Sequence, residues 1–382
     1  MIWIVIFLLG VLVGLVGALI PGIHSNTIIS IGNSLGIENF EFFILAVFGA
    51  HMVASYVPAI FFGIPEQNSV LASLPGHRMT LSGKGLTALK IVLFSLIISL
   101  LLSVGLFYPS MSVFPFVYDG IKEWMPEMLI LISAVLILKS KKPIVGGVLF
   151  LIAGVLGYFT LRADLGDPFL PLFSGMFAIN SILNYSNSKI PEQKEKELNL
   201  DFIPYILVGT VFGFFADLFP GIGSASQIAA FISLLIPFNT AGYLATVSSV
   251  TMSEAVFSFA TAASIGKSRM GATAVLSESI KIQENLGFVL ALFMVSVLIA
   301  VIAVYLIRRK IVEFAKIDFS EMRVLLALYL CGISFLVDGF IGLLVLGVAS
   351  LLGWIFSKLE IEKTLMMGAV IVPTILLLLR VW

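Results

Sequence analysis

The chain has 382 residues, of which 59% are hydrophobic and only 12% are charged. Soluble domains carry about 25% charged residues, so this composition excludes a soluble enzyme or binding module and predicts a polytopic membrane protein. The formal net charge is zero, which gives no indication of a nucleic-acid partner.

Continuous apolar runs, taken in chain order, predict membrane-spanning helices and not the alternating segments of a barrel. The first run lacks a basic start and a cleavage site, so we expect it to be a retained span and not a signal peptide. The clear spans are residues 1–20, 86–108, 125–138, 143–160, 168–185, 203–219, 287–307, 322–338, 341–357 and 362–380. Residues 40–62 and 241–263 are also long enough to cross. The expected fold is therefore all-α.

One break in the apolar pattern occurs twice. The segment GVLVGLVGALIPGIHSNTI (10–28) is matched 199 positions later by GTVFGFFADLFPGIGSASQ (209–227). In both copies an apolar run stops at Pro-Gly, and small or polar residues follow. A duplicated break in corresponding segments points to the binding site of a transporter. We therefore predict one broken or re-entrant helix in each half of the chain.

A polar stretch divides the chain into two predicted repeats. Residues 1–190 would form the first transmembrane repeat, 191–201 a polar linker, and 202–382 the second repeat. Lys and Arg collect in 139–142, 189–196 and 308–323. Placing these clusters in the cytoplasm makes corresponding spans run in opposite directions. The repeats are therefore expected to have inverted topology.

The residues after each break are suited to binding an anion. A helix that starts there presents free N–H groups and the positive end of its dipole. The alternative is that the hydroxyl and amide side chains only cap the helix. A further interruption follows Pro65 in the first half. The candidate substrate-binding residues are Gly22, His24, Ser25, Asn26, Thr27, Glu66, Asn68, Gly221, Gly223, Ser224, Ser226 and Gln227.

Two acidic residues within apolar segments are candidates for binding a coupling ion. Asp217 stands three residues before Pro220, and Glu254 lies in the span 241–263. Ionisable groups at this depth are costly and usually functional, although each could instead make an interhelical hydrogen bond or lie near the headgroups. His24 is replaced by Gly in the second copy, so we expect it to recognise the substrate or to carry a proton. We expect His51 to be a buried, hydrogen-bonded core residue.

The order of these motifs resembles the TctA family, the large membrane subunit of tripartite tricarboxylate transporters. The matching segments are 14–25, AIFFGIPEQNS (59–69), LPGHRMTLSGKGLTAL (74–89), LFPGIGSAS (218–226) and MSEA (252–255). The chain would be a short, divergent member, with His24 and Glu66 at positions where the family has glycine. The resemblance implies a small membrane subunit and an extracytoplasmic binding protein as partners.

The function predicted from these observations is secondary transport of a small organic anion, a carboxylate, coupled to Na⁺ or H⁺. We expect a multi-pass protein of the cytoplasmic membrane, in contact with lipid and forming a homodimer, with no enzymatic activity and no cofactor apart from Na⁺ as coupling ion. The duplicated break also resembles that of polyprenyl-phosphate translocases, a second hypothesis. An intramembrane hydrolase using Ser224 with His24 or His51 is a weaker third, because no motif fixes its geometry.

Overall fold

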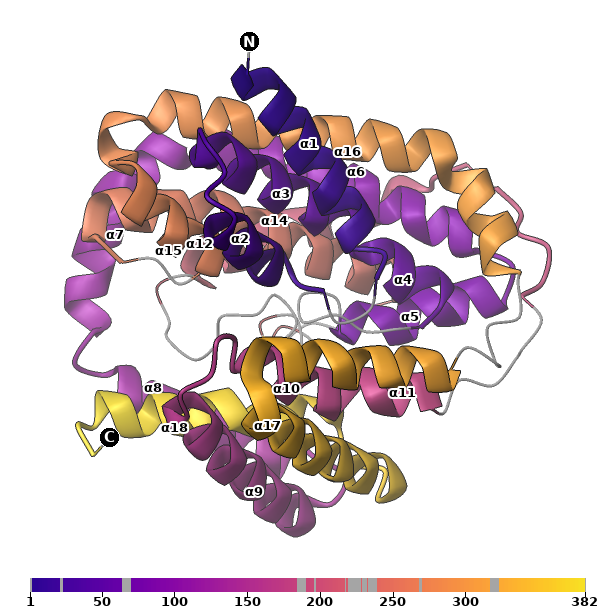
Figure 1. Cartoon of the computed structure of the whole chain (residues 1–382), viewed down its shortest axis with the longest axis vertical. Coiled ribbons are helices and arrows are strands. Elements are labelled where there is room, and N and C mark those ends of the chain that lie inside the picture. Colours follow the sequence, from indigo (N-terminus) through magenta and orange to yellow (C-terminus); the bar gives the residue numbers. More distant parts are fainter. Residues whose placement is uncertain are drawn as a thin grey trace. The chain divides into compact units, whose positions relative to one another are not determined.

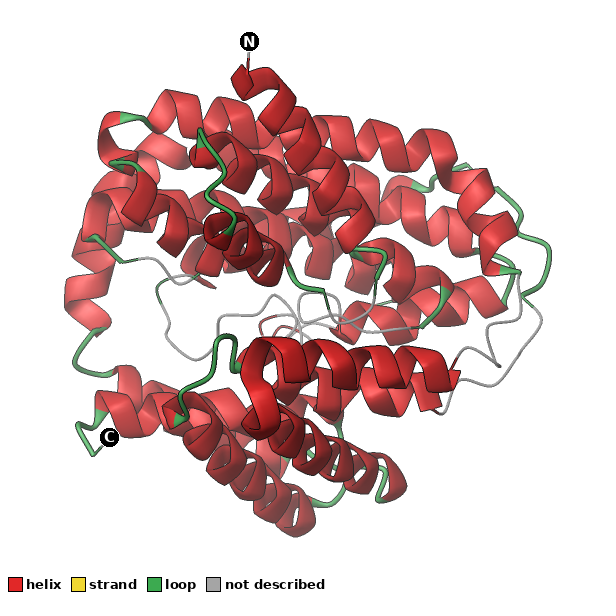
Figure 2. Ribbon diagram, in the orientation of Figure 1, coloured by secondary structure: helices red, strands yellow, loops and turns green. Residues whose placement is uncertain are grey.

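The computed structural model describes residues 2–20, 23–63, 70–183, 190–195, 197–216, 218, 228, 232, 239–267, 270–316 and 323–381. Within these ranges the chain forms helices joined by loops and turns, without a strand (Figure 2). Five helical segments in the described part are long and apolar enough to cross a membrane: Phe40–Phe61, Gly85–Gly105, Pro143–Arg162, Leu286–Ala315 and Arg323–Lys358. The expected all-α polytopic fold is confirmed.

The helices group into two compact units, and each unit takes helices from both sides of the polar linker. The first unit comprises residues 1–117, 187–218 and 223–318. Its elements are α1 (Ile2–Gly17), α2 (Ser25–Ser34), α3 (Phe40–Ala54), α4 (Tyr56–Phe61), α5 (Val70–Leu81), α6 (Gly85–Gly105), most of α7 (Phe107–Ile121), η2 (Leu200–Phe202), α12 (Ile203–Ala216), α14 (Thr240–Ile265), α15 (Gly271–Ser279), η3 (Ile282–Glu284) and α16 (Leu286–Ala315) (Figure 1).

The described residues of the second unit are 118–183 and 323–381. Its helices are α8 (Met125–Leu138), α9 (Pro143–Arg162), α10 (Phe169–Phe173), η1 (Ser174–Ile179), α11 (Asn180–Leu183), α17 (Arg323–Lys358), η5 (Lys363–Met367) and α18 (Gly368–Leu378). In this unit α9 packs against α18, and α17 packs against α10, η1 and α11.

Helix α17 is broken at Gly339, whose φ of 63° and ψ of −154° are not helical. The break falls between the predicted spans 322–338 and 341–357. The neighbouring Asp338 carboxylate accepts the backbone N–H of Asp167 at 2.8 Å. Because φ is positive, glycine is the residue that adopts this conformation without strain.

The same helix pair is built twice in the first unit. Helix α1 packs against α3, and α12 packs against α14. A Cβ added to Gly14 would lie 2.8 Å from the carbonyl oxygen of Val47, and one added to Gly213 would lie 2.8 Å from that of Val250. The absence of a side chain thus lets each pair of helices approach closely. The paired contacts differ by 199 residues in the first helix and by 203 in the second.

A later helix of each half packs against a helix of the other half. Helix α6 packs against α14, and α16 packs against α3. The Ser99 hydroxyl donates to the carbonyl oxygen of Ser249 at 2.8 Å, and the Ser296 hydroxyl donates to that of Ala46 at 2.7 Å. A two-fold relation produces this kind of reciprocal contact. The pattern supports the predicted repeat, while its inverted topology stays a prediction.

Candidate anion-binding site

The first Pro-Gly break joins α1 to the short helix α2. Helix α1 ends at Gly17, and a Cβ there would lie 2.5 Å from Cδ1 of Ile28, so the end of α1 packs directly on α2. The backbone N–H of Ile23 donates to the carbonyl oxygen of Ile20 at 3.2 Å. Helix α2 then begins at Ser25. The predicted broken helix is therefore present in the first half.

His24 caps the start of α2. Its backbone is extended, and its Nδ1 accepts the backbone N–H of Asn26 at 3.2 Å. The alternative that a hydroxyl or amide side chain is the cap is therefore wrong for this copy, and Ser25, Asn26 and Thr27 form the first turn instead. Since Nδ1 is the acceptor, the neutral ring carries its proton on Nε2. Nε2 is buried and has no hydrogen-bond partner among the described residues.

A second helix starts at the same place. Helix α15 begins at Gly271, and a Cβ on this glycine would lie 2.6 Å from Nδ2 of Asn26. Met270 precedes it in an extended conformation and makes no side-chain cap. The N-termini of α2 and α15, from opposite sides of the polar linker, therefore meet at Asn26. Two positive dipole ends favour an anion.

His51 ties α3 to the break. It is 1% exposed, and its Nε2 lies 2.9 Å from the carbonyl oxygen of Ile23. The ring centroids of His24 and His51 are 5.6 Å apart. The expected buried and hydrogen-bonded histidine is thus observed, and its partner is the backbone of the break itself. No pattern in the sequence indicated that partner.

Glu254 occupies the position in α14 that His51 occupies in α3. The Tyr56 hydroxyl lies 2.8 Å from Oγ1 of Thr251, and the rings of Phe48 and Phe259 are in edge contact at 6.0 Å. An offset of 203 residues aligns Tyr56 with Phe259 and Phe48 with Thr251. The two contacts are therefore equivalent between the halves. His51 and Glu254 differ by the same 203 residues, so we treat them as equivalent. Glu254 is 2% exposed.

The equivalence of His51 and Glu254 does not follow from the spacing of the two Pro-Gly motifs. The two Pro-Gly motifs are 199 residues apart, whereas the helices that follow are 203 apart. The second copy is therefore four residues longer between its break and its next helix. An offset of 199 aligns Glu254 with Ser55 and hides the relation to His51.

Several predicted site residues lie outside the described part of the chain. They are Gly22, Glu66, Asn68, Asp217, Gly221, Gly223, Ser224, Ser226 and Gln227. Their roles stay predictions. Leu218, Ile228 and Ile232, which are described, are buried. The described residues contain no cluster of three or more His, Cys, Asp or Glu side chains that could hold a metal ion.

Comparison with known proteins identifies the family. The model of the tripartite tricarboxylate transporter TctA family matches residues 4–368. The chain belongs to the TctA family. This confirms the resemblance found in the sequence and makes the protein a multi-pass integral membrane protein of the tricarboxylate transporter type. Members of the TctA family are large subunits that generally work with a small subunit and a binding protein.

A relative of this TctA protein is the uncharacterised protein MJ1079 of Methanocaldococcus jannaschii, which is 25% identical over 98% of each chain. No solved structure matches the chain. TctA is a family of transporters, and the absence of catalysis stays an expectation.

Proposed function

We propose that this TctA protein transports a small organic anion, a carboxylate, by secondary transport coupled to Na⁺ or H⁺. The observation that carries the proposal is the meeting of the α2 and α15 N-termini at Asn26, whose backbone N–H donates to Nδ1 of His24. A small membrane subunit and an extracytoplasmic binding protein would complete the transporter.

The chemistry of this site fits a carboxylate. Each carboxylate oxygen accepts hydrogen bonds, and the first turns of α2 and α15 offer backbone donors. Nε2 of His24 adds a side-chain donor that lacks a partner among the described residues. Leaving such a buried donor unpaired costs about 1–3 kcal/mol, so a ligand that accepts from it gains this contribution.

Coupling would use the two acidic residues within apolar segments of the sequence. Glu254 lies in α14, which packs against α12 and α6 within the bundle. A carboxylate at this depth favours a bound proton or Na⁺. Its equivalent His51 contacts the carbonyl oxygen of Ile23 in the first break. We propose Glu254, together with the predicted Asp217, as the residues that bind the coupling ion.

A ligand screen on the purified protein tests this function. A compound that binds only the folded state raises its midpoint of thermal unfolding. We expect soluble di- and tricarboxylates to raise the midpoint, and Asn26→Ala to abolish the rise. Asn33→Ala is a matched control, because Asn33 is exposed on the same helix.

The same screen separates the alternative functions. Polyprenyl phosphate would also suit paired helix N-termini, and a rise with this lipid but with no soluble carboxylate would favour a lipid-carrier translocase. An intramembrane hydrolase would require hydrolytic activity that Ser224→Ala removes. Neither result is expected.

A further inference from the structure

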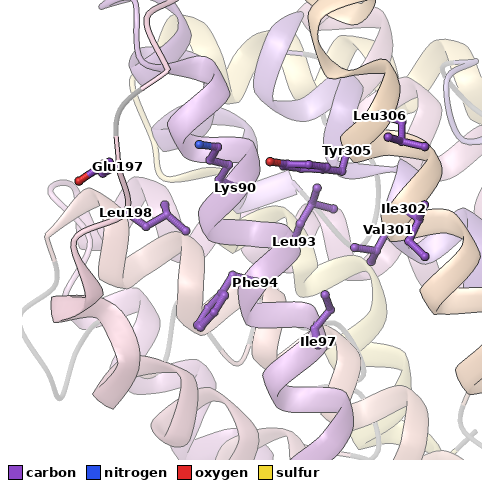
Figure 3. A pocket seen from close by; sticks show the side chains of 10 residues that line it. All are labelled: Lys90, Leu93, Phe94, Ile97, Glu197, Leu198, Val301, Ile302, Tyr305 and Leu306. Carbon is purple, nitrogen blue, oxygen red and sulfur yellow. The ribbon is translucent and has the colours of Figure 1, made fainter.

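A groove separate from the predicted anion site runs between α6 and α16. It has a volume of about 580 Å³. Its lining includes apolar side chains from both helices: Leu93, Phe94 and Ile97 from α6, and Val301, Ile302 and Leu306 from α16. Figure 3 shows Leu93 and Ile97 on the side of α6 toward α16, and Phe94 on the side toward Leu198. None of the predicted substrate-binding residues lines it. The groove is therefore a candidate binding site distinct from the predicted anion site.

Both walls change from apolar to polar in the same direction. Along α6 the groove begins at Ile97 and ends at Lys90, a distance of about 10 Å at 1.5 Å per residue. Along α16 it runs from Val301 to Tyr305 and Leu306, and Arg308 and Arg309 follow. Figure 3 shows the Lys90 amine and the Tyr305 hydroxyl at one end and Ile97 at the other.

The polar end carries an excess of positive charge. The Glu195 carboxylate of the linker lies 2.8 Å from Nζ of Lys90, 3.1 Å from Nε of Arg308 and 3.7 Å from a terminal nitrogen of Arg309. One carboxylate thus faces three cations, and the Arg309 side chain remains 77% exposed. Glu197 at the edge of the groove offsets one further charge, but Figure 3 shows its carboxylate pointing away from the apolar side chains.

The α16 wall of the groove is open to the surroundings of the helices. Leu306 is 70% exposed and Ile302 is 58% exposed, although both belong to a helix that is long and apolar enough to cross a membrane. Within a bilayer these side chains contact acyl chains and not water. A basic residue beside such a surface extends its amine to the headgroup level.

We propose that the groove binds an anionic phospholipid. The phosphate would lie between Lys90, the Tyr305 hydroxyl and Arg309, where the uncompensated positive charge is. One acyl chain would follow the apolar walls toward Ile97. A phospholipid carries a charged headgroup at one end and hydrocarbon at the other, which matches the basic and apolar ends of the groove. Basic pockets between membrane helices bind lipid headgroups in this way.

The test uses the full chain, purified in detergent and stripped of lipid. Phosphatidylglycerol, added as mixed micelles, should raise the midpoint of thermal unfolding by about 3 °C or more, because it binds the folded state. Phosphatidylcholine at the same concentration should raise it much less, and glycerol phosphate, which lacks acyl chains, should leave it unchanged. Equal shifts with both lipids, or the full shift with glycerol phosphate, would overturn the proposal.

Variants then place the lipid in the groove. Leu306→Trp narrows the groove at an exposed apolar position where folding is tolerant, and Arg309→Gln removes the exposed cation. Each should reduce the shift caused by phosphatidylglycerol at least about twofold. Leu298→Trp, on the same helix, and Lys316→Gln, directly after its end, both lie outside the groove and should respond like the wild type. If Leu306→Trp and Arg309→Gln retain the full rise in unfolding midpoint with phosphatidylglycerol, the lipid binds elsewhere and the proposed groove site is wrong.

Discussion

The two nitrogens of the His24 ring have different environments. Nδ1 accepts the backbone N–H of Asn26 and holds the start of α2, whereas Nε2 is buried without a partner among the described residues. Asparagine is among the best N-cap residues but is too short to reproduce Nε2. The structural and ligand-binding contributions of His24 can therefore be separated by one substitution.

We expect His24→Asn to retain stability and to weaken anion binding. The cap is preserved, so the free energy of unfolding should change by less than about 0.5 kcal/mol. Loss of a buried hydrogen bond to a charged ligand should weaken binding about tenfold or more, equivalent to about 1.5–3 kcal/mol. Thermal stability with and without carboxylate measures both quantities. Unchanged ligand affinity would show that His24 is only a cap.

Glu254→Gln removes a buried charge and keeps the size of the side chain. If Glu254 binds the coupling ion, uptake driven by an Na⁺ or H⁺ gradient should fall at least about tenfold in reconstituted vesicles, while substrate exchange at equal gradients persists. Glu278→Gln, at an exposed position of α15, is the matched control. Undiminished gradient-driven uptake would leave Asp217 as the better candidate.

Helix packing in the first unit depends on glycines at matched positions. A Cβ on Gly213 would lie 2.8 Å from the carbonyl oxygen of Val250 and 2.6 Å from Cβ of Ser253. Backbone must therefore move to admit even a methyl group, which costs about 1–3 kcal/mol.

Gly213→Ala should accordingly lower the midpoint of thermal unfolding by several degrees. Gly105→Ala is the contrasting variant, since a Cβ there has nothing within 4 Å. Alanine favours the helix over glycine by up to about 1 kcal/mol, so Gly105→Ala should be neutral or stabilising. Equal effects of the two variants would mean that close packing of α12 on α14 contributes little.

The elements themselves were largely predictable, because each apolar run ends at a recognisable signal. The run 125–138 became α8 with the same limits, and the break after residue 20 leads into a short helix as expected. Contacts between distant helices were not predictable. The meeting of Gly271 with Asn26 and the match of His51 with Glu254 depend on the four-residue difference in spacing, which no local pattern reveals. The groove was missed because its two walls are about 200 residues apart.

At the scale of the whole chain, the polar linker contacts one end of α6 and one end of α16. Gln193 accepts the backbone N–H of Gly85 at 2.6 Å, and Glu195 pairs with Lys90, Arg308 and Arg309. The sequence predicted only a polar linker between the repeats. Its interactions instead join α6 to α16, although the two helices belong to different predicted repeats.

The hydrogen bond from Lys90, with support from Arg308, lowers the pKa of Glu195 to about 2. An unfolded glutamate has a pKa of about 4.3. The stabilising contribution is therefore complete above about pH 4.5 and is lost as the pH falls toward 2. We expect Glu195→Gln to destabilise the protein at pH 6 and to have little effect near pH 2. Asp119→Asn, which breaks an exposed pair with Lys122, should have little effect at either pH.

The exchange of α6 and α16 between halves affects the order of assembly during synthesis. Ser296 of α16 bonds the backbone of α3, yet α16 begins only at Leu286, long after α3 has ended at Ala54. The first half therefore enters the membrane before the helix that completes its core exists. A nascent chain stopped at the linker would expose the face of α3 that α16 covers, and we expect it to be degraded. Two halves produced together as separate polypeptides should each supply the helix that the other lacks.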